Sequence, residues 1–266
     1  MKLLFETVIV AVSMFSAVPM PKVDWNEKNM KYAICAFPAV GVLIGVLFVI
    51  LSKVGILLQV PPFFMGILLA VLPILVTGGI HLDGYCDTQD ALASHGDKDK
   101  LLEILSDPHI GAFAVIRLVT LMLVWSGLWV VWAGERYRTA SSDISEFSLF
   151  LLFPIARILS GIGICRLPKA KKEGLAYLFA SQTDRRRAVL ILLFQAGICM
   201  FGMIGFGGWK GACSVAAACV IYGLYQARCK KLLGGTTGDL AGWFLVRCEL
   251  YMLAAWYVCS LVMRCL

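Results

Sequence analysis

The chain has 266 residues, of which 60% are hydrophobic and 15% are charged. Soluble chains are about 45–50% apolar and about 25% charged, so this composition excludes an ordinary soluble domain and a disordered chain. The formal net charge of +7 would suggest a nucleic-acid partner in a soluble protein, but basic loops of a membrane protein have a simpler origin in topology, so we expect no nucleic acid.

The predicted elements are membrane helices, because a bilayer core about 30 Å thick takes about 20 apolar helical residues. The first run, 3–18, carries Glu6 and stops at Pro19, so it either crosses the bilayer or lies in the interface as an amphipathic helix. A cleaved signal peptide is not expected, because Met20-Pro21-Lys22 offers no small-x-small site. Seven clearer runs follow, at 33–51, 56–77, 113–133, 147–165, 188–208, 211–227 and 240–263.

We therefore predict an all-α, polytopic integral membrane helical bundle with seven or eight membrane segments, forming one domain over residues 1–266. Most of the loop Lys and Arg residues follow the first, third, fifth and seventh segments, which places those loops on the cytoplasmic side. Membrane lipid is thus a partner, and a homo-oligomer is an arrangement that the sequence leaves open.

Polar residues concentrate in residues 81–111, which hold seven of the 17 acids and all three histidines. Asp83, Asp87 and Asp90 are spaced i, i+4, i+7 and share one face of a helix. Such stacked carboxylates repel one another unless a cation lies among them. Oxygen ligands select Mg²⁺, Mn²⁺ or Ca²⁺ over zinc, and Mg²⁺ is usually held by one or two carboxylates with substrate phosphates. The pattern predicts Mg²⁺ and a phosphate-bearing substrate; the alternative is a solvated acidic face.

Two glycine pairs precede acidic residues at the same spacing. Gly78 and Gly79 come before Asp83, and the segment Gly234-Gly235-Thr236-Thr237-Gly238-Asp239 opens the last span. Glycine amides and a helix amino end suit a phosphate or ribose, although a plain turn explains the second segment equally well. The shared Gly-Gly-x-x-x-Asp pattern is either a trace of duplication or chance.

Charged residues inside the spans are costly, about 2.5–3.5 kcal/mol for a basic residue at mid-helix. Arg157 and Glu249 therefore either line a deep polar pocket or form a structural pair. The basic loop 166–187 either meets anionic lipid headgroups or contacts substrate phosphate. His81 is either a satisfied polar residue or a base.

The segment His81-Leu82-Asp83-Gly84-x-x-Asp87-Thr88-x-Asp90 resembles the signature of the cobalamin synthase family, the adenosylcobinamide-GDP ribazoletransferases. Leu105-x-Asp107-x-x-Ile110-Gly111 and the block from Gly234 to Glu249 are also similar to motifs of that family, in the same order. The resemblance extends over nearly the whole chain. It implies a multi-pass enzyme of a prokaryotic inner membrane that joins adenosylcobinamide-GDP to α-ribazole, or its 5′-phosphate, with Mg²⁺ and release of GMP.

The resemblance and the residue chemistry together give expected roles. Asp83, Asp87, Asp90 and Asp107 are the expected metal ligands, and His81 or one of the first three aspartates accepts the proton of the ribazole hydroxyl. The expected substrate-binding residues are Gly78, Gly79, His109, Arg157, Thr237, Gly238, Asp239 and Glu249. The chain has Leu105-Ser106-Asp107-Pro108-His109 where the family often has Met-Lys-Asp-Ser-Arg, so His109 or the loop 166–187 would replace the missing phosphate contacts.

Two competing functions are weighed against this one. A CDP-alcohol phosphatidyltransferase also uses clustered Asp and Gly, but its longer pattern, with Ala-Arg after the first Asp-Gly pair, is not matched. A secondary transporter would place its key acids near the middle of the membrane. The acidic cluster instead begins where an apolar run ends.

Overall fold

The computed structural model describes residues 2–139, 147–171 and 174–265. In chain order its helices are α1 (Lys2–Phe15), α2 (Glu27–Met30), α3 (Ala33–Leu57), α4 (Pro62–Thr77), α5 (Ile80–Ala93), α6 (Lys98–Ile104), α7 (Ala112–Thr139), α8 (Phe147–Phe150), α9 (Leu152–Arg166), α10 (Leu175–Gln182), α11 (Arg185–Leu233) and α12 (Gly238–Cys265). The described residues contain no strand, only an isolated bridge between Lys169 and Thr236. The all-α prediction is confirmed.

Five helical stretches are long and apolar enough to cross a membrane: α3, α7, α8 with α9, α11 and α12. The pair α4 and α5 would be a sixth if it is one span bent by 92°. Many large apolar side chains are exposed on the outside of the bundle, such as Phe201 and Trp209, as expected of a surface that faces lipid. The polytopic bundle is confirmed, whereas seven or eight segments, and a single domain over the whole chain, remain predictions.

Helix α11 is 49 residues long but is broken at Gly208, where φ is 54° and ψ is −134°. A straight helix of that length would extend about 73 Å, more than twice the bilayer core. The chain instead folds back: Gly211 lies so close to Met203 that a Cβ at Gly211 would collide with the Met203 carbonyl. Arg185 and Cys229, near the two ends of α11, both act electrostatically on Lys169. The two limbs of α11 correspond to the predicted runs 188–208 and 211–227.

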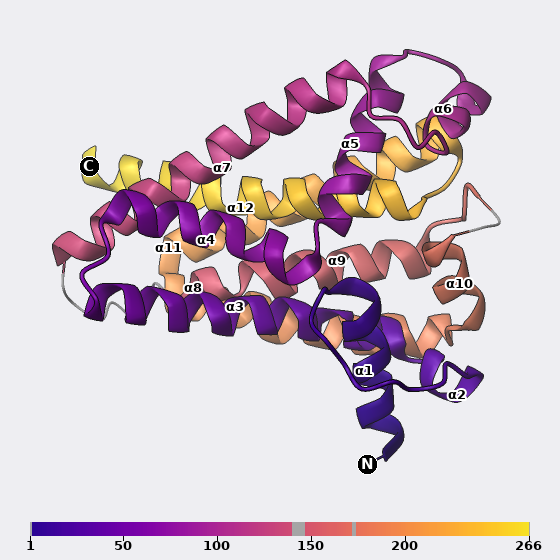
Figure 1. Cartoon of the computed structure of the whole chain (residues 1–266), viewed down its shortest axis with the longest axis horizontal. Helices are drawn as coiled ribbons and strands as arrows, with labels where there is room; N and C mark the ends of the chain where they lie inside the picture. The colour runs from indigo at the N-terminus through magenta and orange to yellow at the C-terminus, as the bar shows by residue number, and fades with distance from the viewer. Residues whose placement is uncertain (1, 140–146, 172–173, 266) are drawn as a thin grey trace.

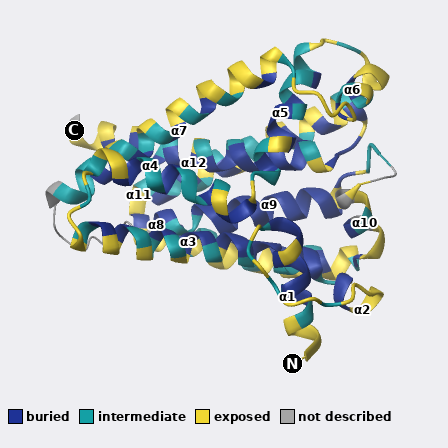
Figure 2. Cartoon of the chain, in the orientation of Figure 1, coloured by how far each residue is buried: buried dark blue, intermediate teal, exposed yellow. Residues whose placement is uncertain are grey.

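Helix α9 is the centre of the bundle. Every residue from Leu152 to Cys165 is buried, and α9 appears as a dark blue column between α3 and α12 (Figure 2). Helix α1 runs across the side of α3 rather than along it (Figure 1). With 14 residues it is about 21 Å long, short of the bilayer core, which favours the interfacial alternative over a crossing.

The short helices α2, α6 and α10 and the loop between α11 and α12 gather at one end of the bundle, whereas the C-terminus and the α3–α4 connection lie at the other (Figure 1). Loops that follow alternate segments therefore share an end, as the charge pattern predicts. We call this the polar end. It is where the candidate site lies.

Candidate active site

Helices α5 and α12 cross at two glycines, and this crossing builds the site. A Cβ at Gly84 of α5 would lie 2.8 Å from the Cα of Asp239, and one at Gly242 of α12 would lie 3.2 Å from the carbonyl oxygen of His81. Only residues without a side chain allow the two backbones to approach so closely. The crossing brings Asp83 of α5 and Asp239 of α12 to one cavity.

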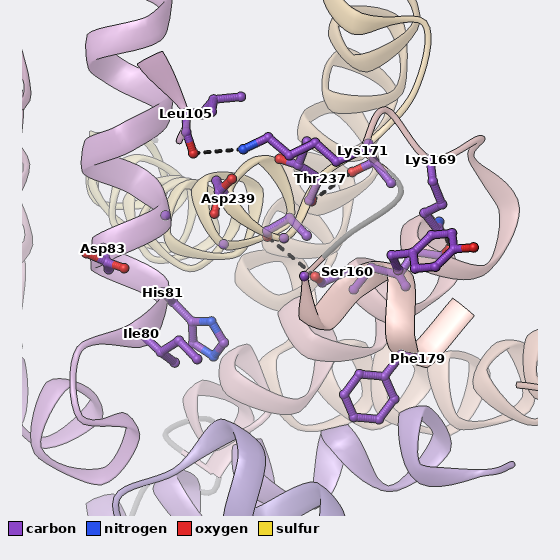
Figure 3. Close-up of a pocket in the computed structure, with 18 of the residues that line it drawn as sticks. Ile80, His81, Asp83, Leu105, Ser160, Lys169, Lys171, Phe179, Thr237 and Asp239 are labelled. Carbon is purple, nitrogen blue, oxygen red and sulfur yellow. Dashed lines mark hydrogen bonds between the residues drawn. The ribbon is translucent and has the colours of Figure 1, made fainter. Parts of the chain in front are cut away.

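This cavity, which we call the acidic pocket, has a volume of about 480 Å³ and opens at the polar end. Figure 3 shows its residues arriving from α5, α9, α10, α12 and the segment after α9. Its polar side chains are His81, Asp83, Ser106, Ser160, Lys169, Lys171, Tyr177, Thr236, Thr237 and Asp239. Phe15, Phe37 and Phe179 add an apolar aromatic wall. The pocket therefore presents both charge signs beside aromatic rings.

Asp83 and Asp239 line the pocket, and they act on the neighbouring carboxylate of Asp87, which does not line it. Asp87, one turn beyond Asp83, experiences repulsion from Asp83, Asp239 and Asp90 and attraction from Lys171. Lys171 also attracts Asp239. A group of carboxylates opposed by one ammonium is a charge arrangement that a divalent cation would relieve.

Among the described residues, no three His, Cys, Asp or Glu side chains already stand in position to enclose a metal ion. Mg²⁺ does not need such an enclosure, because it commonly keeps several waters and takes one or two carboxylates together with substrate phosphates. The hard oxygen donors of Asp83, Asp87 and Asp239 suit that mode of binding. The carboxylates present are therefore compatible with Mg²⁺ that binds together with a phosphate.

Residues 167–171, which we call the strap, close one side of the pocket. Thr236 donates its N–H to the carbonyl oxygen of Pro168 at 2.8 Å, and the N–H of Ala170 donates to the Thr236 carbonyl at 3.0 Å. Lys171 Nζ donates to the carbonyl oxygen of Leu105 at 2.8 Å and to Ser106 Oγ at 2.9 Å. The strap thus ties α9, α6 and the start of α12 together.

Lys169 of the strap donates to the carbonyl oxygens of Ile164 and Leu167. Burial, together with the nearby charge of Arg185, lowers the pKa of Lys169 to about 8. Lys169 and Lys171 lie within the basic loop 166–187. From the sequence, this loop either meets anionic lipid headgroups or contacts substrate phosphate. For these two residues, lining of the pocket favours the phosphate interpretation.

His81 is buried and faces the pocket (Figure 3). Its ring centroid lies 5.7 Å from that of Phe37 and 6.5 Å from that of Phe15. Its Nε2 makes no hydrogen bond within the described part of the chain. A buried ring nitrogen without a partner is unusual and is available to a bound molecule.

Asp90 lies on the predicted acidic face, but its carboxylate is already engaged. Oδ2 accepts the N–H of Gly111 at 2.6 Å, and Oδ1 accepts the N–H of Ala114 at 2.8 Å. These are free amides at the start of α7, which a carboxylate caps favourably. Asp90 therefore anchors α7 to α5.

Asp107 and His109 lie in the exposed loop after α6 and pair with each other, with Oδ1 and Nδ1 2.7 Å apart. Hydrogen bonds from the backbone and ring of His109 lower the pKa of Asp107. Neither residue lines the acidic pocket, although Leu105 and Ser106 just before them do. Their predicted roles in metal and substrate binding remain predictions.

Arg157 and Glu249 form an ion pair of 2.7 Å, with 1% and 7% of their side chains exposed. Arg157 also donates to the Phe153 carbonyl at 2.9 Å. The pair lines a separate cavity of about 40 Å³ behind His81. Of the two alternatives for these residues, the structure shows the pair, and His81 lines both this cavity and the acidic pocket.

The predicted substrate-binding glycines and threonine separate into two groups. Thr237 and Gly238 line the pocket at the start of α12, where Thr237 Oγ1 accepts the N–H of Leu240 at 3.1 Å. Gly78 and Gly79 have φ of 64° and 82° and form the corner between α4 and α5 outside the pocket lining. Their observed contribution is to orient α5.

The aromatic wall was not anticipated, because Phe15, Phe37 and Phe179 come from the separate helices α1, α3 and α10 and follow no local pattern. The signal for the lysines was present, but it was divided among the seven basic residues of the loop 166–187, which spans 22 positions. The site therefore combines a predicted acidic side with a basic side that was one of two alternatives from the sequence and an aromatic side that the sequence did not predict.

Comparison with known proteins identifies relatives over nearly the whole chain. A sequence profile described as cobalamin-5-phosphate synthase matches residues 7–257. An adenosylcobinamide-GDP ribazoletransferase of Lachnoclostridium phytofermentans is 38% identical over 241 residues, which cover 91% of this chain and 89% of the relative. Proteins of the same name from Clostridium perfringens and a Geobacillus species are 31% and 30% identical, covering 94% and 99% of this chain and 96% and 100% of the relatives. No solved structure matches significantly.

Proposed function

Because the chain belongs to the cobalamin-5-phosphate synthase family, we propose that it is an adenosylcobinamide-GDP ribazoletransferase of vitamin B12 biosynthesis. Its acceptor is α-ribazole or the 5′-phosphate of α-ribazole. The ribazole hydroxyl oxygen forms a bond to the phosphorus next to cobinamide, the pyrophosphate bond breaks, and GMP leaves. Relatives that carry this name match at least nine-tenths of the chain.

The observation that carries the proposal is the meeting of Asp83, Asp239, Lys169 and Lys171 around one pocket. Phosphoryl transfer depends mainly on positioning and on stabilising charge at the phosphates. Lys169 and Lys171 supply positive charge to the pyrophosphate from the strap. The acids on the opposite wall need a cation before a phosphate can approach them.

We assign that cation as Mg²⁺, held by Asp83 and Asp87 with Asp239 close by. Bound Mg²⁺ supplies charge neutralisation and polarisation at the phosphates. Asp90 and Asp107 were predicted as further ligands. The hydrogen bonds of Asp90 to the start of α7 and the exposed position of Asp107 support structural roles for both.

His81 is the proposed acceptor of the ribazole hydroxyl proton, through its unpartnered Nε2. The aromatic wall of Phe15, Phe37 and Phe179 keeps water from one side of His81 and offers flat surfaces to a planar group of a substrate. The buried Arg157–Glu249 pair fixes the floor beneath the ring.

We place the protein in a prokaryotic cytoplasmic membrane, with the polar end facing the cytoplasm. The surplus of Lys and Arg in the loops at that end supports this orientation. It also gives a pocket that meets nucleotide substrates on the side where they are made. A transporter is not favoured, because the acids line a pocket at one end of the bundle rather than its middle.

The direct test uses the purified full chain in detergent with adenosylcobinamide-GDP, α-ribazole and Mg²⁺. We expect GMP to be released in equal amounts with the cobalamin product. A parallel reaction with a CDP-alcohol and the same acceptor should release no CMP. No GMP release with α-ribazole, with its 5′-phosphate or with related ribazoles would contradict the proposal.

A further inference from the structure

A second cavity lies on the other side of α5, where α5, α7, α11 and α12 meet, and it has a volume of about 890 Å³. Its lining includes Arg117, Arg228, Lys231 and Arg247 and contains no Asp or Glu. It shares no lining residue with the acidic pocket. We call this cavity the basic groove.

The four cations of the basic groove form no salt bridge with any described residue. Arg228 and Arg247 instead both lie over the ring of Trp243, with guanidinium carbons 5.4 Å and 4.5 Å from its centroid. Arg247 also donates to Tyr251 Oη at 3.2 Å. Two guanidinium groups gathered at one ring repel each other, so an anion placed between them would be stabilised.

Three of the four cations lie close to the ends of their helices at the polar end of the bundle. Arg228 and Lys231 lie in the last turns of α11, and Arg117 lies in the second turn of α7. Arg247 is nine residues into α12, about 13 Å from its start. Leu121 and Val124, farther along α7, line the groove beyond Arg117 and are apolar. The groove is thus basic at the polar end and apolar deeper in the bundle.

We propose that the basic groove binds one anionic phospholipid, with its phosphate between Arg228 and Arg247 and an acyl chain against α7. Basic pockets between membrane helices suit such headgroups, and arginine matches phosphate oxygens in a two-pronged geometry. A zwitterionic lipid carries no net negative charge and would leave the cations unbalanced.

The proposed lipid would also support the neighbouring site without entering it. Tyr85 and Gln89 of α5 line the groove, on the helix that carries Asp83 and Asp87. Tyr85 Oη donates to the Arg117 carbonyl at 3.4 Å, which connects α5 to α7 across the groove. A bound lipid would therefore hold α5 and α7 together from the outer side.

The test measures lipid retention and not catalysis. The full chain is purified in detergent, and phosphatidylglycerol or phosphatidylcholine is added while binding is followed by native mass spectrometry and thermal unfolding. We expect phosphatidylglycerol to bind and raise Tm. The double variant Arg228→Gln with Arg247→Gln should bind it roughly thirty-fold more weakly. Arg186→Gln, which removes an exposed cation outside the groove, should behave as the unmodified chain.

Lys231→Gln is the second variant, because it leaves both arginine contacts with Trp243 intact and should weaken phosphatidylglycerol binding by a smaller factor. Equal binding of phosphatidylglycerol and phosphatidylcholine, or unchanged binding in both variants, would overturn the proposal. Inorganic phosphate and α-ribazole 5′-phosphate are tested as competitors. Displacement of the lipid by either at comparable concentration would show a site for a soluble phosphate and would equally overturn it.

Discussion

The corners at Gly78-Gly79 and Gly234-Gly235 are two versions of one local design. In each, the first glycine ends a helix in the left-handed conformation, with φ of 64° and 67°. Each is followed by a helix whose aspartate, Asp83 or Asp239, lines the acidic pocket. Each copy of the Gly-Gly-x-x-x-Asp pattern therefore supplies one carboxylate, and the two carboxylates reach the same pocket from different helices.

The two corners differ in what holds them. At the second corner, the strap pairs with Thr236, and a Cβ on Gly235 would lie 2.5 Å from the Pro168 carbonyl oxygen. At the first corner, Gly79 has open space around it. The nearby hydrogen bond to another segment is the one that the Ala17 N–H donates to the Val76 carbonyl oxygen at 2.8 Å. A short motif thus sets the turn, while packing from elsewhere in the chain sets its rigidity.

The largest effect should come from removing the carboxylate that each corner supplies. We expect Asp83→Asn and Asp239→Asn each to lower kcat roughly a thousand-fold, because charge stabilisation at the phosphates is lost. GMP release measures this, and Asp99→Asn on the exposed side of α6 is the matched control. Near-normal turnover in Asp239→Asn would show that the second corner supplies only structure.

The next effect concerns the crossing that joins the two corners. Gly84→Ala should lower kcat/KM about tenfold and cost about 1–3 kcal/mol of stability, because its Cβ would meet backbone atoms of Asp239. Gly242→Ala should do less, since its closest contact is 3.2 Å. Gly127→Ala is the control, because a Cβ at Gly127 would have no atom within 4 Å. It measures the effect of replacing a helical glycine by alanine without a clash. Equal losses at Gly84 and Gly242 would disprove this ranking.

A smaller effect separates the clamped corner from the open one. Gly79→Ala should cost only the strain of a left-handed residue, about 1–2 kcal/mol. Gly235→Ala should cost more, because the strap backbone occupies the space. Thermal unfolding of both variants in the same detergent measures the difference. If Gly79→Ala were the less stable of the two, the strap would not be the clamp that we describe.

The smallest effect should appear as a pH dependence of the strap. With its pKa lowered to about 8, Lys169 is charged below pH 8 and neutral above it. The KM for adenosylcobinamide-GDP should therefore rise severalfold between about pH 7 and 9, as the ammonium that meets the pyrophosphate is lost. Lys169→Arg stays charged and should show a flat KM over this range. A rise of the same size in Lys169→Arg would assign the titration to another group.

Sequence periodicity predicted the bundle well, because lipid imposes a length and an apolar composition on each span. It even divided 188–208 from 211–227, on either side of the break at Gly208. It also placed Asp83 and Asp87 on one face of a helix, which α5 confirms. These features depend on residues close in the chain.

The features that the sequence left open or missed depend on residues far apart in the chain. Arg157 and Glu249 are separated by 92 positions, so from the sequence their pairing was only one of two alternatives. Asp90 has the spacing of a third metal ligand, but only the structure reveals that the free amides of Gly111 and Ala114 take its carboxylate. Lys171 and the aromatic wall similarly reach the pocket through tertiary packing.

The fold-back of α11 at Gly208 also bears on how the protein is made. The strap precedes the first limb of α11, and Thr236 follows the second limb. The strap and Thr236 therefore cannot form their hydrogen bonds until both limbs of α11 have entered the bilayer. The acidic helix α5 is synthesised much earlier, because the chain is made from its N-terminus to its C-terminus. A partly synthesised chain thus carries Asp83 without the lysines or Asp239, and the pocket is completed only by the last membrane helix.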